Sequence, residues 1–139
     1  MILMTETYSY THAHHLPTFP DGHKCRRIHG HTSDVTITIE VENGERGYAF
    51  DHALLDDVAR EAIGPLDHQL INEIPGLEDG LAETQLAWIV AGLEIALAPL
   101  GATLARVDLD EWSTGGTLRR VAHRKSWARV LASDGSAGR

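Results

Sequence analysis

The sequence predicts an α+β domain in which two helices cover one face of a four-stranded antiparallel sheet. Residues 35–41 and 103–111 alternate apolar and polar side chains, as half-buried strands do. Residues 54–62 and 86–97 carry apolar side chains at helical spacing. The order is strand, strand, helix, helix, strand, strand, which favours two helices packed on one face of an antiparallel sheet.

The first part of the chain is expected to form a pair of strands. Residues 5–15 read as a strand rich in Thr and Tyr, and the prolines and glycine that follow mark a loop. The second strand is expected over 32–42. Asn43-Gly44 is typical of a hairpin turn, and residues 47–50 are expected to be extended again.

Two helices follow, each with its own boundary signals. Asp51 is the expected N-cap of the first helix, which ends at Gly64-Pro65. The second helix is expected over 82–98, where Pro99 and Gly101 close it.

The last strands complete the sheet. They are expected over 103–111 and 117–123. Residues 1–132 are expected to form a single domain, and the small, polar residues 133–139 a disordered tail. A four-stranded sheet has two open edges, and pairing with neighbouring subunits is one way to cover them.

Composition limits the function classes. The chain has 139 residues and a net charge of -8, which argues against a general nucleic-acid binder. Its single cysteine cannot form an internal disulfide, so we expect a cytoplasmic protein, and no stretch has the length of a transmembrane helix. Lys24, Arg26 and Arg27 either offer an anionic substrate a local basic patch or are solvated loop charges.

A histidine cluster is the main chemical signal. On a strand, residues two apart share a face, so His29 and His31 project together if the second strand begins early, as do His12 and His14 on the first. Neighbouring strands would bring His14 to the pair, and three imidazoles with an open position suit a catalytic zinc ion. Cys25, just upstream, would be a proton-transfer group or nucleophile. Alternatively, the histidines are ordinary surface or core residues.

Three further positions admit two interpretations each. Glu111 ends an apolar row, where it either caps a strand or accepts the paired N–H donors of a purine or pterin edge. Asp67 and His68 are an acid beside a potential base, or they cap a turn. Trp112 packs in the core or stacks on a flat ligand.

The sequence resembles the 6-pyruvoyl-tetrahydropterin synthase / 6-carboxy-tetrahydropterin synthase family over most of its length, roughly residues 8–112. The matching motifs occur together and in order. They are Ala13-His14-His15-Leu16-Pro17, Asp21-Gly22-His23-Lys24-Cys25, His29-Gly30-His31, Phe50-Asp51, Leu66-Asp67-His68, Leu70-Ile71-Asn72, Ile74-Pro75-Gly76-Leu77-Glu78 and Glu111. Two of these runs, 22–25 and 74–78, favour the bacterial 6-carboxy branch, which makes a deazapurine precursor for queuosine-type nucleosides.

The resemblance implies the tunnelling fold, in which trimers close a barrel and two trimers form a hexamer with active sites between subunits. It implies zinc on His14, His29 and His31. It also implies proton abstraction by Cys25 with help from Asp67 and His68, and binding of the pterin ring by Glu111. The substrate of the resembled branch is 7,8-dihydroneopterin triphosphate, and its products are 6-carboxy-tetrahydropterin, acetaldehyde and triphosphate.

The chain departs from the family pattern in the wall of the expected pocket. Gly80-Leu81 stands where a Pro-Thr pair is usual, and Trp112, His12 and Arg26 stand where small residues are usual. The alternatives are therefore a related zinc enzyme acting on a different pterin or purine-like substrate, such as one forming 6-pyruvoyl-tetrahydropterin, and a non-catalytic pterin-binding protein.

Overall fold

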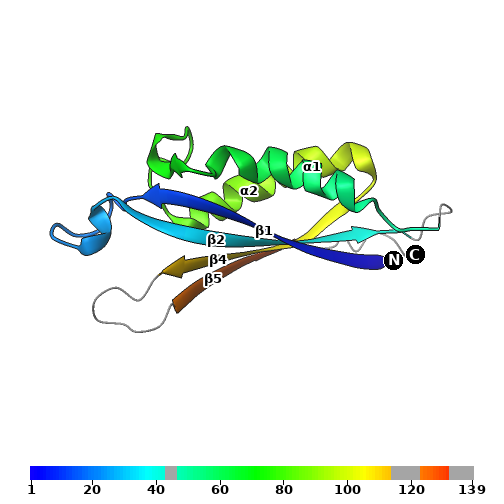
Figure 1. Ribbon diagram of the computed structural model, residues 1–139, viewed down its shortest axis with the longest axis horizontal. Coiled ribbons are helices and arrows are strands. Elements are labelled where there is room, and N and C mark those ends of the chain that lie inside the picture. Colours follow the sequence, from blue (N-terminus) through cyan, green and yellow to red (C-terminus); the bar gives the residue numbers. More distant parts are fainter. Residues whose placement is uncertain (43–46, 114–122, 132–139) are drawn as a thin grey trace.

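The computed structural model describes residues 1–42, 47–113 and 123–131. It has the expected two layers, with two helices lying side by side on one face of a twisted sheet (Figure 1). The helices are α1 (His52–Ile63) and α2 (Ala82–Leu97). Of the helices in this part of the chain, none combines the length and apolar character needed to cross a membrane.

Within the described residues the sheet has five strands, not the four expected. They are β1 (Ile2–His14), β2 (His29–Val41), β3 (Gln69–Leu70), β4 (Thr103–Ser113) and β5 (His123–Val130), in the spatial order β3-β1-β2-β4-β5.

The expectation of a purely antiparallel sheet is also wrong, because β3 pairs with β1 in parallel. A strand of two residues shows no alternation in the sequence, so the pattern could not reveal it. Hydrogen bonds from the two residues before β3 fix it against β1. The backbone N–H of His68 donates to the Thr11 carbonyl, and the Asp67 carboxylate accepts from the Thr11 N–H.

Element boundaries follow the sequence signals closely in the helices. Asp51 caps α1, since its carboxylate accepts the backbone N–H of Ala53 at 2.9 Å. The short 3-10 helix η2 (Gly64–Leu66) follows α1 directly. The helix α1 therefore ends at the expected Gly64-Pro65 pair. In α2 the residue before the first turn is Leu81, whose side chain makes no capping hydrogen bond.

Other boundaries differ from expectation. β2 begins at His29 rather than residue 32, and residues 47–50 form a bend rather than a strand. The described last strand, β5, begins where the predicted one was to end. The predicted turn at Asn43-Gly44, most of the predicted 117–123 strand and the predicted tail lie outside the described residues.

The core lies between the helices and one face of the sheet. Val35, Ile37 and Ile39 of β2 are fully buried against Leu55 of α1 and Leu93 of α2. Burial of these side chains anchors the register of β2, because a shift by one residue would turn them towards solvent. The same register fixes the face on which His29 and His31 lie, at the start of β2.

Candidate metal centre

The pairing of β1 with β2 gathers four histidines at one end of the sheet. In this antiparallel pair His12 lies opposite His31, and His14 lies opposite His29. All four have the parity of the buried Tyr10 and face the helix-covered side. Their ring centroids are 4.6 to 5.9 Å apart for the neighbouring pairs. The alternation in the sequence therefore predicted this grouping correctly.

His14, His29 and His31 turn one nitrogen each toward a common point. Their potential ligand atoms all lie within 4.8 Å of one another, and the two Nε2 atoms of His14 and His29 are 3.1 Å apart. The second nitrogen of each ring faces a backbone carbonyl. Nδ1 is 2.7 Å from the Gly80 oxygen in His14, 2.7 Å from the Arg27 oxygen in His29, and 3.1 Å from the Trp112 oxygen in His31.

These carbonyls determine the tautomers. A carbonyl only accepts hydrogen bonds, so we assign the proton to each Nδ1 and a lone pair to each Nε2. The Ser113 hydroxyl, 3.2 Å from His31 Nδ1, can accept from the same N–H. Lone pairs that face one another repel unless a cation lies between them. A proton on Nε2 would make His14 an imidazolium, which its burial disfavours. The donor set therefore fits a divalent metal ion held by three imidazoles, each oriented by a backbone carbonyl.

Burial keeps the inner rings neutral. Loss of solvent, the largest cause, lowers the pKa of His14 to about 4, against a smaller opposing effect of its bond to Gly80. Burial also lowers the pKa of His31, and this outweighs the nearby carboxylate of Glu111, whose Oε1 is 3.6 Å from His31 Nε2. Burial thus favours the neutral form of His31 in its contact with Glu111. Neutral rings are the form that binds metals.

A chain of buried hydrogen bonds supports His14 from behind. The Gly80 carbonyl also accepts from Gln85 Nε2 at 3.2 Å, and Gln85 Oε1 accepts the Tyr10 hydroxyl at 2.8 Å. Gln85 is 1% exposed. We did not predict this residue, although one signal was available: Gln85 lies four residues before Ile89, on the apolar stripe of α2.

Glu111 and His12 complete the buried polar group. Glu111 on β4 is 6% exposed and lies opposite Ser33 of β2. His12 is 3% exposed, and neither of its ring nitrogens has a hydrogen-bond partner among the described residues. Burial, the largest cause, lowers the pKa of His12 to about 3. His12, His14 and Glu111 form a second group whose ligand atoms lie within 4.8 Å of one another.

The other predicted residues lie outside both metal-binding groups. Cys25 is half-buried in the 3-10 helix η1 (Lys24–Arg26), within the loop that joins β1 to β2. Its backbone carbonyl accepts the N–H of Leu16 at 2.8 Å, which closes this loop. Among the described residues, neither candidate metal group includes Cys25, Asp67 or His68.

Asp67 and His68 do form a pair. Asp67 Oδ2 is 2.9 Å from His68 Nδ1, and both side chains are exposed at the β3 edge of the sheet. Here the backbone of His68 has a φ of 58°, an uncommon conformation for a residue other than glycine. The carboxylate orients the imidazole through Nδ1, and the other ring nitrogen, Nε2, is not part of this contact.

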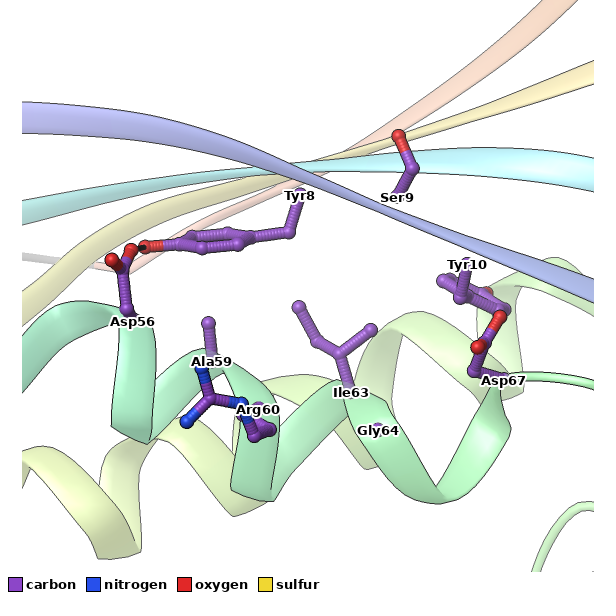
Figure 2. Close-up of a pocket in the computed structure, with 9 residues that line it drawn as sticks. All are labelled: Tyr8, Ser9, Tyr10, Asp56, Ala59, Arg60, Ile63, Gly64 and Asp67. Atoms are coloured by element: carbon purple, nitrogen blue, oxygen red, sulfur yellow. Dashed lines mark hydrogen bonds between the residues drawn. The ribbon is translucent and has the colours of Figure 1, made fainter.

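Asp67 also lines a cavity of about 240 Å³ between β1 and α1. In Figure 2 Asp67 lies beside Tyr10 at one end of this cavity, and Tyr8 meets Asp56 at the other. The lining contains no histidine. This cavity therefore lies beside the histidine cluster rather than within it, and Tyr10, whose ring centroid is 5.0 Å from that of His12, adjoins both.

Two departures from the family pattern have structural roles on this chain. Trp112 follows Glu111 on β4 and so points to the opposite face, where its Nε1–H donates to Asp34 at 2.9 Å and Arg124 lies over its ring. The prediction that Trp112 packs in the core is wrong, since its side chain is exposed, and stacking on a flat ligand stays a prediction. Arg26 pairs with Asp21 at 3.0 Å and donates to the Phe19 carbonyl, so its charge is used within the loop.

Comparison with known proteins identifies the family of this chain. The family model described as 6-pyruvoyl tetrahydropterin synthase matches residues 3–120. The chain is 32% identical over 105 residues to a Synechocystis protein named 6-carboxy-5,6,7,8-tetrahydropterin synthase, covering 71% of this chain and 80% of that protein.

Solved structures show the same fold. The Caenorhabditis elegans 6-pyruvoyl tetrahydropterin synthase superposes with a TM-score of 0.69 at 16% identity, over 94% of this chain and 96% of that one. The Plasmodium vivax 6-pyruvoyl tetrahydropterin synthase gives 0.53 at 13% identity, over 94% and 100%. By sequence and by fold, this chain belongs to the 6-pyruvoyl tetrahydropterin synthase family.

Proposed function

We propose that this chain is a zinc-dependent lyase that converts 7,8-dihydroneopterin triphosphate and one water molecule to 6-carboxy-5,6,7,8-tetrahydropterin, acetaldehyde and triphosphate. The observation that carries the proposal is the convergence of three imidazoles, each with its Nδ1 proton committed to a backbone carbonyl. The name of the Synechocystis relative supports the choice of reaction within the family.

His14, His29 and His31 would hold the zinc ion. When bound, zinc supplies a Lewis acid that makes protons on a coordinated hydroxyl and its carbon easier to remove. This part of the proposal is supported by the three histidines, each of which offers one ring nitrogen within 4.8 Å of the others.

The remaining roles concern proton transfer and recognition. Cys25 would abstract a proton from the substrate side chain, as a thiolate formed near a cation. His68, held by Asp67 at 2.9 Å, would exchange a proton through its Nε2. Glu111 would accept two parallel N–H bonds from the pterin ring.

The proposal includes the assembly expected from the sequence. Asp67 and His68 lie on the β3 edge, outside the histidine groups of their own chain, so we propose that a neighbouring subunit completes each site. A homohexamer in the cytoplasm, built as a dimer of trimers, would provide such shared sites.

The test is an anaerobic incubation of zinc-loaded protein with 7,8-dihydroneopterin triphosphate, with products identified by mass spectrometry. We expect 6-carboxy-tetrahydropterin and acetaldehyde from the wild type and from the control His52→Ala, whose imidazole contacts exposed Glu6. Cys25→Ala should lose both products. If the zinc-loaded hexamer gives neither product, the substrate assignment is wrong.

The second candidate is a related enzyme acting on another pterin. It is favoured by Leu81, which has no hydrogen-bonding group at the start of α2. The same incubation distinguishes it, because formation of a 6-pyruvoyl product would have a different mass and would release no acetaldehyde. Binding of pterin that depends on Glu111 but without turnover would indicate a non-catalytic member of the family.

A further inference from the structure

We propose that this chain has a second, deeper metal position formed by His12, His14 and Glu111, and that it competes with the three-histidine position for His14. Its occupant would be a divalent first-row transition-metal ion. The inference rests on the proposed function in one respect. Glu111 could not bind the pterin ring while it binds such an ion.

The unpartnered imidazole of His12 is the first observation. A neutral imidazole has one N–H donor and one lone pair, and burial without partners is unfavourable for both. His12 is 3% exposed, and among the described residues neither nitrogen finds a partner. Its nearest rings are Tyr10 at 5.0 Å and His14 at 5.3 Å between centroids. The Tyr10 hydroxyl already donates to Gln85.

The position of Glu111 is the second observation. Its carboxylate comes from β4 and meets the two histidines of β1 across the intervening strand β2. In β2, Ser33 lies opposite Tyr10 on one side and Glu111 on the other. His31, which lies opposite His12, brings its Nε2 to 3.6 Å from Glu111 Oε1. All three donors are at least nine-tenths buried.

The donor set indicates the class of ligand. Two imidazoles and one carboxylate suit Fe(II), Mn(II), Co(II) or Zn(II) better than Mg²⁺ or Ca²⁺, which prefer oxygen ligands. A metal ion would give the lone pair of His12 a partner and would bind the carboxyl group of Glu111 at the same time. The three-histidine group, by contrast, has only one fully buried member, His14.

His14 makes the two positions exclusive. Its Nδ1 proton is committed to the Gly80 carbonyl at 2.7 Å, so the ring has a single free lone pair. One lone pair binds one ion. The chain should therefore bind one ion with full affinity, either among the three histidines or in the deeper group.

The test isolates the deeper position by removing a residue of the outer one only. His29→Ala destroys the three-histidine group and leaves His12, His14 and Glu111 intact. Co(II) titration of the full-length protein, followed by visible absorption and calorimetry, measures stoichiometry and affinity without any pterin. Failure of the proposed substrate therefore has no bearing on this result.

We expect His29→Ala to bind one Co(II) per chain. Adding His12→Phe or Glu111→Gln to it should each lower the affinity by at least about ten-fold, as loss of a ligand requires. The control His52→Ala/His29→Ala should match His29→Ala. Circular dichroism and thermal unfolding show whether each variant is folded. If either His12→Phe or Glu111→Gln fails to fold, the other still tests the proposal.

Other outcomes overturn the proposal. If His29→Ala binds no Co(II), or binds it with an affinity that neither His12→Phe nor Glu111→Gln changes, the deeper position does not exist. If the wild type binds two ions per chain with similar affinity, the positions are not exclusive and the shared role of His14 is wrong.

Discussion

The Gly80 carbonyl oxygen accepts the Nδ1–H of His14 at 2.7 Å, and this contact joins the start of α2 to the metal-binding end of β1. The backbone of Gly80 has a φ of 68°, a conformation that favours glycine. A Cβ at this position would lie 2.3 Å from the His15 carbonyl oxygen. The conformation of one glycine thus decides where the tautomer-fixing carbonyl points.

Gly80→Ala should lower both stability and metal affinity. The left-handed backbone costs an alanine about 1–2 kcal/mol, and the clash with a backbone atom forces a further shift. Movement of the carbonyl that orients His14 should weaken zinc binding by about 10–100-fold. Urea unfolding and zinc calorimetry measure the two effects.

Gly101→Ala is the matched control. Its φ is 73°, but among the described residues no heavy atom beyond its chain neighbours lies within 4 Å of the added Cβ. We expect only the conformational cost and unchanged zinc affinity. Equal zinc affinity in the two variants would show that the Gly80 carbonyl does not support His14.

The Tyr10–Gln85 pair should behave as a coupled buried hydrogen bond. Gln85→Leu leaves the Tyr10 hydroxyl without its acceptor in the core, which costs about 1–3 kcal/mol. Tyr10→Phe leaves Gln85 Oε1 unpaired. The double variant should lose clearly less than the sum of the two, because no unpaired partner remains. Urea unfolding of the four proteins gives the coupling energy.

The exposed Tyr8–Asp56 hydrogen bond is the control for that cycle. Its O···O distance is also 2.8 Å, but solvent can replace either partner. The cycle of Tyr8→Phe and Asp56→Ala should give a smaller coupling energy. A Tyr10–Gln85 coupling no larger than this one would contradict the buried network.

Removal of the metal should destabilise the fold. A ligand that binds only the folded state at one hundred times its dissociation constant adds about 2.7 kcal/mol to the free energy of unfolding. Chelation of the zinc-loaded protein should therefore lower Tm, and added zinc should restore it. His14→Ala should show no zinc-dependent change in Tm, since this residue belongs to both metal groups.

Asp67 should show an acid-dependent contact with β1. The backbone N–H of Thr11, the largest cause, and then the His68 side chain lower the pKa of Asp67 in the folded state. A lowered pKa stabilises the fold above the ordinary Asp pKa, and this contribution is lost as pH falls through the folded value. The amide resonance of Thr11 in NMR spectra should titrate with a midpoint below 3.8.

Asp67→Asn should remove that transition from the Thr11 amide. The contact itself can persist, since an amide oxygen also accepts a hydrogen bond. A Thr11 transition that survives in Asp67→Asn would assign the titration to another group.

The sequence by itself determined the two layers and the histidine grouping. Alternation along residues 35–41 placed the core-facing row of β2, and the same parity extended to His29 and His31. Helical spacing and the Asp51 cap located α1 almost to the residue. These features depend on local periodicity, which a strand or helix displays along its own residues.

Only the tertiary structure decided the rest of the site. The parallel strand β3, the turn of the Gly80 carbonyl toward His14 and the hydrogen bond between Gln85 and Tyr10 all depend on partners distant in the sequence. So do the orphaned nitrogens of His12 and their nearness to Glu111, since strand order sets which residues meet across β2. Periodicity states which face a side chain takes, but contacts between elements depend on how those faces pack together.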